Sequence, residues 1–413
     1  MTSNAFVILK DRGFVAQTND EAAIRAALGG NPLTYYIGFD PTASSLHCGS
    51  LVPIMAMAHL QRAGHKPVAL VGGGTAAVGD PSGKTEMRQM LSFEDIAANG
   101  QGILGQIQRY LNLDGSAGMS ANNADWLMKL NYIEFLRDIG RYFRVNEMIR
   151  ADAYRARLER EEGLSFIEFN YQLLQAYDYL QLFERLGCVL QMGGDDQWSN
   201  ILAGTDLIRR KHAKPAYCLT FPLLTTARGE KMGKTAAGAV WLDAARTSPY
   251  DFYQYWINTD DRDVHKFLAL FTFLPMPEVE TLGAAQGAEL NAAKEVLAYE
   301  ATRLCHGAAA ADEARQAAKA AFGGGGDLSS LPSTTLPLAR LREGIALLDL
   351  FVETGLTASK GDARRLVQQG GAYVNDAVIG DAQAKVTAAD LKDGAVLLRA
   401  GKKKYHRVVA GSG

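Results

Sequence analysis

Residues 33–74 read LTYYIGFDPTASSLHCGSLVPIMAMAHLQRAGHKPVALVGGG. The apolar run at 33–40 predicts a buried strand, and apolar residues at helical spacing predict a helix over 49–63. Pro53 is compatible with that helix because it falls in the first turn, where an amide has no intrahelical partner. A second strand is expected at 66–74, and strand, loop, helix, strand in this order predicts a βαβ unit with a parallel sheet.

The rest of the chain extends this α/β pattern and then leaves it. We expect a long helix over 166–187, a buried strand over 188–194 and a helix after it. From about Ser248 to Ala321 the sequence is rich in alanine and reads as helical. Residues 322–337, FGGGGDLSSLPSTTLP, have the composition of a linker.

Composition excludes several classes of protein. The 413 residues are 47% hydrophobic and 21% charged, and the net charge of −2 excludes a polycation that binds nucleic acid through bulk charge. The first residues resemble neither a signal nor a transit peptide, and no window approaches the ~18 apolar residues of a membrane helix, so we expect no membrane contact and a cytoplasmic location. The four cysteines form no C-x-x-C element, so neither a disulfide framework nor a metal site is expected.

The glycine-rich stretch VGGGTAAVGDPSGKTEMR (71–88) suggests two other nucleotide sites. Gly72, Gly74 and Ala77 fit the weak form of the dinucleotide fingerprint, but Asp80–Gly83 would interrupt the helix that must follow. GDPSGKT also approaches a P-loop, but the required first glycine falls on Val78. Neither an NAD site nor a P-loop is favoured over a flexible loop.

Two short motifs carry the stronger signal. HCGS (47–50) follows the first strand, and KMGKT (231–235) places two lysines three residues apart among glycines. Taken alone, the second motif reads as a solvated basic turn. Its chemical alternative is a loop that brings two ammonium groups onto a polyphosphate.

Together these motifs resemble the HIGH and KMSKS signatures of class I aminoacyl-tRNA synthetases. YIGFDPTASSLH, GHKPVALVGGGTAAVGDPSGK, ANNADW, QLLQAYDYLQL, LQMGGDDQWSNI and GKTAAGAVWLD resemble the bacterial tyrosyl-tRNA synthetases, in the right order and over nearly the whole chain. The resemblance implies an α/β fold: a Rossmann-like parallel-sheet catalytic domain at 1–225, the KMSKS-type loop and a helical anticodon-binding domain at 226–321, and, after the linker, a small α+β S4-like RNA-binding domain at 338–413.

The resemblance also implies the reaction and its partners. Tyrosine and ATP give tyrosyl-adenylate and pyrophosphate, and the tyrosyl group then passes to the terminal adenosine of tRNA(Tyr). Neither step needs a protein nucleophile, so catalysis is expected to rest on positioning and charge stabilisation. Mg²⁺ is expected with the ATP phosphates and not in a protein cage. The family also implies a homodimer and no tightly bound cofactor.

Residue roles follow from the same resemblance. Tyr36 and Asp178 are assigned to the phenolic hydroxyl of tyrosine. Tyr171, Gln175 and Asp80 are assigned to the ammonium group, and Gln197 to the reacting carboxylate. Tyr171, Gln175 and Asp178 share one helix face by their spacing. The nucleotide is assigned to Gly38, Asp40, His47, Gly49, Ser50, Gly194, Asp196, Lys231 and Lys234, and catalysis on the phosphates to Thr42, His47, Lys84, Arg88, Lys231, Lys234 and Thr235.

The C-terminal segment carries a separate resemblance to S4-type RNA-binding modules. TASKGDARRLVQQGGAYVNDAVIGDAQAKV, followed by VLLRAGKKKYHRV, supplies basic side chains that suit RNA phosphates. The residues assigned to RNA are Lys360, Arg364, Arg365, Lys402, Lys403 and Lys404. A merely solvated basic face is the alternative for this segment.

Three positions depart from the family pattern. Ser50 ends the first motif, where histidine or asparagine is common, and Ile37 cannot offer the ribose the polar group that some relatives have. Asp195 replaces a common serine and adds a charge beside Asp196. Two further alternatives stay open: a synthetase-like RNA-binding protein that has lost aminoacylation, and an enzyme specific for another amino acid such as tryptophan.

Overall fold

The computed structural model describes residues 4–82, 91–151, 154–155, 158–159, 163–229, 231–235, 238–323, 331–401 and 404–411. It divides the chain into two compact units, one of residues 1–247 and 256–305 and one of residues 248–255 and 306–413. The boundary predicted at residue 226 does not coincide with this division. Along the described parts of the chain, no helix combines the length and apolar character needed to cross a bilayer.

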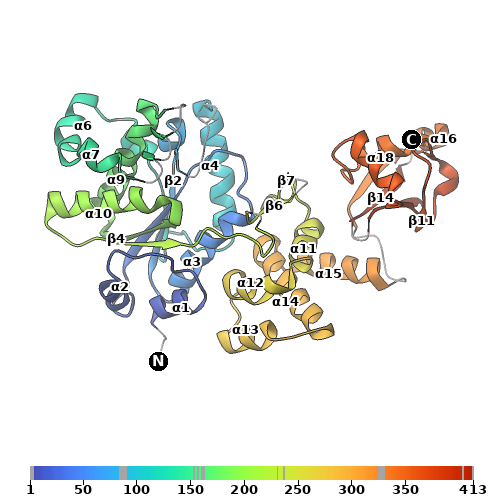
Figure 1. Ribbon diagram of the computed structural model, residues 1–413, viewed down its shortest axis with the longest axis horizontal. Coiled ribbons are helices and arrows are strands. Elements are labelled where there is room, and N and C mark those ends of the chain that lie inside the picture. The colour runs from blue at the N-terminus through green and yellow to red at the C-terminus, as the bar shows by residue number, and fades with distance from the viewer. Residues whose placement is uncertain are drawn as a thin grey trace. The chain divides into compact units, whose positions relative to one another are not determined.

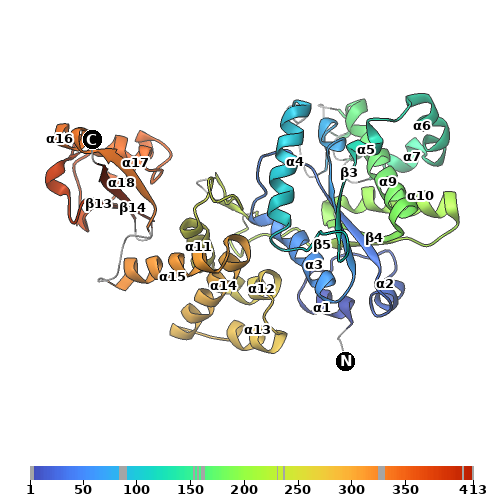
Figure 2. The ribbon, with the colours of Figure 1, turned by 180° about the vertical axis from the view of Figure 1, so that it is seen from behind.

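The first unit is built on a five-stranded sheet in which every pairing is parallel, in the order β3-β2-β1-β4-β5. Helices α3 and α4 contact β2, and α9 and α10 contact β4 (Figures 1 and 2). The strands are β1 Thr34–Phe39, β2 Lys66–Val71, β3 Met119–Asn122, β4 Cys188–Gly194 and β5 Tyr217–Phe221, with a short antiparallel pair, β6 Lys234–Thr235 and β7 Gly238–Ala239.

The helices of this unit precede, connect and follow the strands. They are α1 Ala5–Asp11, α2 Glu21–Leu28, α3 Leu51–Arg62, α4 Phe93–Ile107, α5 Ala124–Leu127, α6 Tyr132–Asp138, α7 Val145–Met148, α9 Phe166–Leu186, α10 Trp198–His212, α12 Val264–Phe271, α13 Met276–Gly283 and α14 Ala288–His306. The predicted strand–helix–strand unit is thus confirmed as β1, α3 and β2.

Local sequence explains why α9 lies where it was expected. Ser165 and Glu168 form a capping box at its start, which satisfies amides that have no partner within the helix. Gly187 ends the helix with a φ of 61°, a left-handed conformation that glycine adopts without a steric penalty. The chain then enters β4 directly, and α9 lies against this strand.

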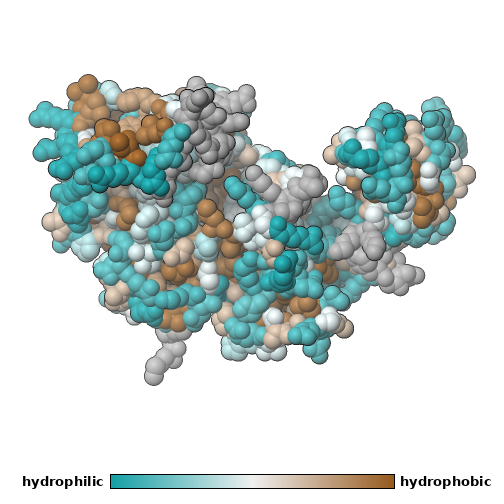
Figure 3. Space-filling model, viewed as in Figure 1, coloured by the Kyte–Doolittle hydropathy of each residue, from teal (hydrophilic) through white to brown (hydrophobic). Residues whose placement is uncertain are grey.

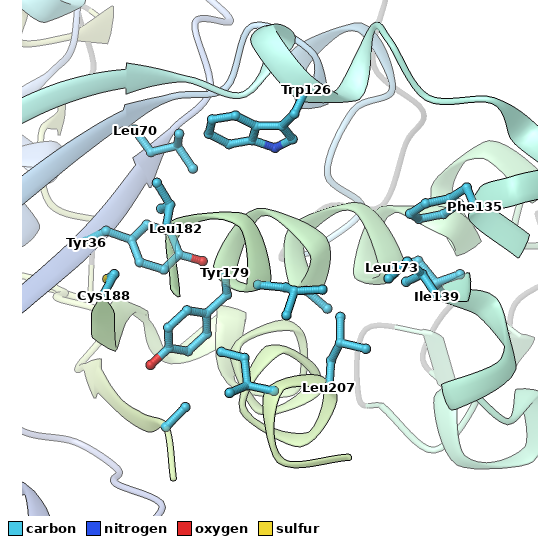
Figure 4. Packing of buried hydrophobic residues seen from close by; sticks show 14 of the residues in the cluster. Tyr36, Leu70, Trp126, Phe135, Ile139, Leu173, Tyr179, Leu182, Cys188 and Leu207 are labelled. Carbon is cyan, nitrogen blue, oxygen red and sulfur yellow. The ribbon is translucent and has the colours of Figure 1, made fainter. Parts of the chain in front are cut away.

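The core next to β1 is rich in aromatic side chains. The rings of Tyr36 and Tyr179 lie 5.3 Å apart, and Figure 4 shows Trp126 and Leu70 on the same side of the packed cluster. Tyr36 is 1% exposed, so its ring is a core element while its hydroxyl needs a polar partner. This packing fixes the ring of a residue that was assigned to substrate.

The second unit contains a smaller mixed sheet in the order β11-β10-β13-β14-β8, with a core of leucine, valine and alanine side chains. Its strands are β8 Ser333–Pro337, β9 Ile345–Ala346, β10 Ala372–Val374, β11 Ala377–Val378, β12 Lys385–Val386, β13 Ala395–Ala400 and β14 Lys404–Gly411. Its helices are α11 Pro249–Ile257, α15 Ala308–Gly323, α16 Leu338–Glu343, α17 Leu347–Glu353 and α18 Lys360–Gln368.

The structure differs from the sequence prediction within the stretch 322–337. Its last five residues form β8, which pairs in parallel with β14 at the edge of the sheet. Threonine favours strands, and proline is tolerated on an edge strand, so a Ser/Thr/Pro composition typical of a linker also suits this position.

Candidate active site

The sheet order places a binding crevice at the carboxyl ends of β1 and β4. The chain runs from β1 outward to β2 and β3 and then returns to the other side of β1 as β4, which makes this pair the topological switch point. A cavity of about 790 Å³ opens there. Among its lining residues are the predicted Tyr36, Gly38, Asp40, Thr42, His47, Gly49, Ser50, Asp80, Tyr171, Gln175, Asp178, Gly194, Asp196, Gln197 and Lys231.

Asp178 is a buried carboxylate held by two side-chain donors. Asn123 Nδ2 donates to its Oδ2 at 2.8 Å, and Trp126 Nε1 donates to its Oδ1 at 2.7 Å. The residue is 2% exposed, and burial raises the pKa of Asp178 to about 7 even though both hydrogen bonds favour the ionised form. The carboxylate therefore has a fixed orientation in the cavity.

Three buried polar atoms of residues that line this cavity make no hydrogen bond with the described residues. They are the hydroxyl of Tyr36, Oε1 of Gln175 and Oε1 of Gln191. Burial raises the pKa of Tyr36, and the nearby charge of Asp178 raises it further, so this hydroxyl keeps its proton. Unpaired buried polar atoms are costly, and a ligand with matching donors and acceptors would satisfy them.

Two further carboxylates are oriented by neighbours from distant parts of the chain. Asp40 accepts hydrogen bonds from Tyr171 Oη at 2.8 Å and from Thr75 Oγ1 at 2.7 Å. Asp80 accepts one from Gln197 Nε2 at 2.7 Å, and burial raises its pKa. With Asp178 and Asp196, the cavity is lined by four carboxylates, which suits a cationic group such as an ammonium.

The HCGS turn fixes the tautomer of His47. Its Nδ1 accepts a hydrogen bond from the Gly49 amide at 3.0 Å, so a neutral imidazole carries its proton on Nε2 and can donate from there. Cys48 is fully buried and free of a disulfide, and burial raises the pKa of its thiol well above the ordinary value. Because thiolates, and not thiols, react and bind metals, Cys48 is a packing residue.

The two signature motifs touch through their glycines. A Cβ on Gly49 would lie 3.0 Å from the Met232 carbonyl oxygen, and a Cβ on Gly233 would lie 2.7 Å from the Gly49 amide nitrogen. Gly233 also has a φ of 77°, which side chains rarely adopt. Both glycines are therefore required for the backbones of the HCGS and KMGKT segments to meet.

The predicted phosphate ligands are described to different extents. Lys84 and Arg88 fall outside the described residues, and for Lys234 and Thr235 only the backbone, in β6, is described. Lys231 is exposed and lines the cavity. The structure thus brings the first motif and Lys231 together at one end of the cavity.

The glycine-rich turn after β2 has a steric explanation of its own. A Cβ on Gly72 would lie 1.9 Å from Asp40 Oδ1, so only glycine lets this carboxylate reach Thr75. The turn continues as a 3₁₀ turn at Thr75–Ala77, and in the described part of this segment, up to Ser82, no dinucleotide-type helix follows the glycines. Gly72 is thus required for packing against Asp40.

The three departures from the family pattern have different outcomes. Ser50 lines the cavity, and its hydroxyl does not cap α3, so a donor is available at this position. Ile37 is 3% exposed and offers the cavity only apolar surface. Asp195 accepts hydrogen bonds from Thr220 Oγ1 at 2.7 Å and Gln17 Nε2 at 2.8 Å and does not line the cavity.

Replacing Asp195 by serine is therefore expected to affect stability more than ATP binding. Hydrogen bonds to a charged group contribute roughly 1.5–3 kcal/mol each, and the shorter serine side chain loses at least one of them. We expect a melting temperature a few degrees lower and a KM for ATP within about twofold of the wild type. Thermal unfolding and steady-state kinetics measure the two quantities, and a tenfold higher KM would contradict this account.

The basic residues assigned to RNA lie in the second unit, in different settings. Lys360 pairs with Asp349 at 2.5 Å, and Arg365 pairs with Asp362 on the same helix. Arg364 and Lys404 are exposed, whereas Lys402 and Lys403 lie outside the described residues. Local carboxylates therefore neutralise part of the positive charge that the sequence suggested.

Sequence reasoning missed the residues that orient the ligand-binding groups. Asn123 and Trp126 were present in the quoted block ANNADW, but no role was given to them. Their position directly after β3, at the carboxyl end of a parallel strand, is the signal that could have identified them. Thr75, which donates a hydrogen bond to Asp40, lies in the glycine-rich turn after β2 and was likewise given no role.

This fold and cavity define a class I aminoacyl-tRNA synthetase. A family model described as tRNA synthetases class I (W and Y) matches residues 29–323, and a model described as Tyrosine--tRNA ligase SYY-like C-terminal domain matches residues 327–408. The predicted α/β class with a Rossmann-like sheet is confirmed.

Comparison with individual proteins identifies the family within this class. A tyrosine--tRNA ligase of Desulfosudis oleivorans is 57% identical, covering 98% of this chain and 99% of its own, and one of Clostridium tetani is 53% identical, covering 99% and 100%. A C-terminally truncated mitochondrial tyrosyl-tRNA synthetase of Aspergillus nidulans superposes with a TM-score of 0.68 at 31% identity, covering 76% of this chain and 92% of its own. The chain belongs to the tyrosine–tRNA ligase family. It is an enzyme that activates tyrosine with ATP and transfers the tyrosyl group to tRNA.

Proposed function

We propose that the cavity binds tyrosine with its hydroxyl against Tyr36 and Asp178 and its ammonium group against Tyr171, Gln175 and Asp80. The observation that carries this assignment is that two of the unpartnered atoms in the cavity, Tyr36 Oη and Gln175 Oε1, belong to residues assigned to opposite ends of tyrosine. The first suits a hydroxyl, and the second can only accept, as an ammonium requires. A ligand with a hydroxyl at one end and an ammonium at the other satisfies both.

The ATP phosphates lie between the two signature motifs in this proposal. The Nε2–H of His47, the hydroxyl of Thr42 and the ammonium of Lys231 contact the transferring phosphates, together with Lys84, Arg88, Lys234 and Thr235. Gly38, Asp40, Gly49, Ser50, Gly194 and Asp196 bind the nucleoside, and Gln197 contacts the reacting carboxylate. A Cβ on Gly194 would lie 2.5 Å from Asp196 Oδ1, so glycine leaves room for this carboxylate at the ribose.

Mg²⁺ accompanies the ATP phosphates in this scheme. Magnesium keeps much of its water and is commonly bound through substrate phosphates, where it neutralises charge on the transferring group. Within the described ranges, no group of three or more His, Cys, Asp or Glu side chains could hold a metal ion. The lysines and His47 stabilise the same developing charge from the protein side.

The pH dependence of tyrosine use tests the assignment of Asp178. With a pKa of about 7 for Asp178, the ionised acceptor is lost as the pH falls below 7, so kcat/KM for tyrosine should fall about tenfold per pH unit below that value. The folded-state pKa lies above the ordinary value of 3.8, so the contribution of Asp178 to the free energy of unfolding decreases as pH rises from about 4 to 7. A kcat/KM that stays flat between pH 5.5 and 8 would contradict the assignment.

We also propose that the enzyme is a homodimer and works in the cytoplasm, where ATP and tRNA are available. Large apolar side chains are exposed around α6 and α7, where Figure 3 shows a brown patch at the upper left. Exposed apolar patches of this kind mark interaction surfaces. The side chains are Met128, Tyr132, Ile133, Leu136, Val145, Ile149, Phe166 and Ile167.

Replacing Ile133 by aspartate tests this surface, because the side chain is 68% exposed and its loss costs the monomer little packing. We expect sedimentation to report twice the chain mass of 44.6 kDa for the wild type and the single mass for the variant. Val378→Asp is the matched control, since Val378 is 55% exposed in the second unit. A wild-type monomer, or an Ile133→Asp dimer as stable as wild type, would contradict the proposal.

In this scheme the S4-like domain predicted at 338–413 binds tRNA. The residues that contact the tRNA are Lys360, Arg364, Arg365 and the Lys402–Lys404 stretch. The exposed guanidinium of Arg364 is the strongest part of the assignment, because Lys360 and Arg365 have carboxylate partners on the same unit. Contacts to phosphates depend strongly on salt, so tRNA binding should weaken as the salt concentration rises.

A further inference from the structure

Residues 238–243 form a strap that joins the two signature motifs through backbone hydrogen bonds. The Val240 amide donates to the Gly233 carbonyl at 2.9 Å, and the Val240 carbonyl accepts from the Cys48 amide at 2.9 Å. On either side of this link, Leu242 donates to the Leu46 carbonyl at 2.9 Å, and Trp241 and His47 are antiparallel bridge partners. The strap therefore fixes the backbone of Trp241 beside the HCGS turn.

The Trp241 side chain contacts the His47 imidazole. The ring centroids are 6.3 Å apart at an angle of 71°, which is an edge-to-face arrangement, and Trp241 lines the cavity. This arrangement is favourable for aromatic rings because a positive edge meets a negative face. The imidazole is thus held at two points, by the Gly49 amide on Nδ1 and by the indole against the ring.

Two residues that follow the strap, Arg246 and Thr247, also hold Trp241. The guanidinium carbon of Arg246 lies 3.4 Å from the centroid of the Trp241 ring, and Arg246 Nη1 donates to Ser44 Oγ at 3.4 Å. The Trp241 amide donates to Thr247 Oγ1 at 3.0 Å. A cation stacked on an indole is the most favourable pairing of this type, and here it links the strap to the loop that precedes His47.

We propose that Trp241 is a positioning residue for adenylate formation, which orients the His47 imidazole toward the ATP phosphates, and that Arg246 keeps Trp241 in place. The proposal rests on the assigned contact between His47 and phosphate. A group that acts only when charge develops on the phosphates affects kcat and leaves tyrosine binding unchanged. Trp241 itself need not touch tyrosine, because its effect passes through the imidazole.

A double-mutant cycle on the full-length enzyme tests the proposal, with tyrosine-dependent exchange of pyrophosphate into ATP as the assay. Trp241→Leu should lower kcat about tenfold and leave the KM for tyrosine within about twofold. Trp241→Phe keeps an aromatic ring and should recover most of the loss. In a His47→Ala background, Trp241→Leu should change kcat by less than about twofold, because the group it positions is gone.

Arg246→Gln supplies a second variant that leaves the Trp241 side chain intact. It should lower kcat about threefold, again only when His47 is present. Arg25→Gln is the matched control, since Arg25 stacks at 4.9 Å on Phe6, which does not line the cavity. It should leave kcat unchanged.

Two results would overturn the proposal. If Trp241→Leu costs the same tenfold with and without His47, or mainly raises the KM for tyrosine, the indole has an independent structural role. If His47→Ala alone leaves kcat unchanged, the assigned role of His47 fails, and the proposal for Trp241 fails with it. Additivity in the cycle overturns only the role of Trp241, so the two failures are distinguishable.

Discussion

Replacing Asp178 by alanine should lower kcat/KM for tyrosine about 10³-fold in the pyrophosphate-exchange assay. The substitution removes a charged hydrogen-bond acceptor from a buried site, and it takes from Trp126 Nε1 the acceptor that it has in the structure. Asn123 Nδ2 loses one of its two acceptors and keeps Thr75 Oγ1. Activity with phenylalanine, which has no hydroxyl, should change little. The preference for tyrosine over phenylalanine therefore collapses, and tyrosyl-tRNA synthetases are themselves the reference example of selection through a substrate hydroxyl.

Glu184→Ala provides the control for this substitution. Glu184 lies on the same helix, α9, but its carboxylate binds Lys211 and His212 at the surface, at 2.9 and 2.7 Å. Surface ion pairs contribute little, so this variant should keep the kinetics of the wild type. If Asp178→Ala folds and still prefers tyrosine as strongly as the wild type does, the hydroxyl is recognised elsewhere.

Replacing His47 by alanine should lower kcat for adenylate formation about 10²–10³-fold, the usual cost of removing one preorganised donor to developing negative charge. The KM for tyrosine should stay within about twofold, because His47 belongs to the phosphate end of the cavity in our assignment. Single-turnover measurement of tyrosyl-adenylate formation separates this effect from product release.

Cys48→Ala is the natural comparison, since the thiol adjoins His47 but is fully buried. Removing one buried sulfur affects packing, so a small loss of stability with unchanged kcat is expected. Equal losses in the two variants would mean that the turn as a whole, and not the imidazole, determines the rate.

Local sequence was sufficient to predict the elements that carry the site. The alternation of apolar runs and turns over 33–74 predicted β1, α3 and β2, and the spacing of Tyr171, Gln175 and Asp178 predicted their shared face on α9. Each of these features depends on residues close together in the chain. That is where periodicity and capping are informative.

Interactions between distant segments could not be predicted in the same way. The orientation of Asp178 depends on Asn123 and Trp126, more than fifty residues away, and Asp195 turns from the cavity because Thr220 and Gln17 bind it. The sequence suggested only that Asp195 adds charge beside Asp196. Side-chain direction at a turn follows from tertiary partners, which no local pattern specifies.

The most direct test of the central claim compares tyrosine, tryptophan and phenylalanine as substrates for ATP–pyrophosphate exchange by the wild type and by Tyr36→Phe. We predict exchange that depends on tyrosine, little with the other two amino acids, and a selective loss of about tenfold in kcat/KM for tyrosine when the Tyr36 hydroxyl is removed. A folded wild type that catalyses no exchange, or that uses tryptophan as well as tyrosine, would contradict the account.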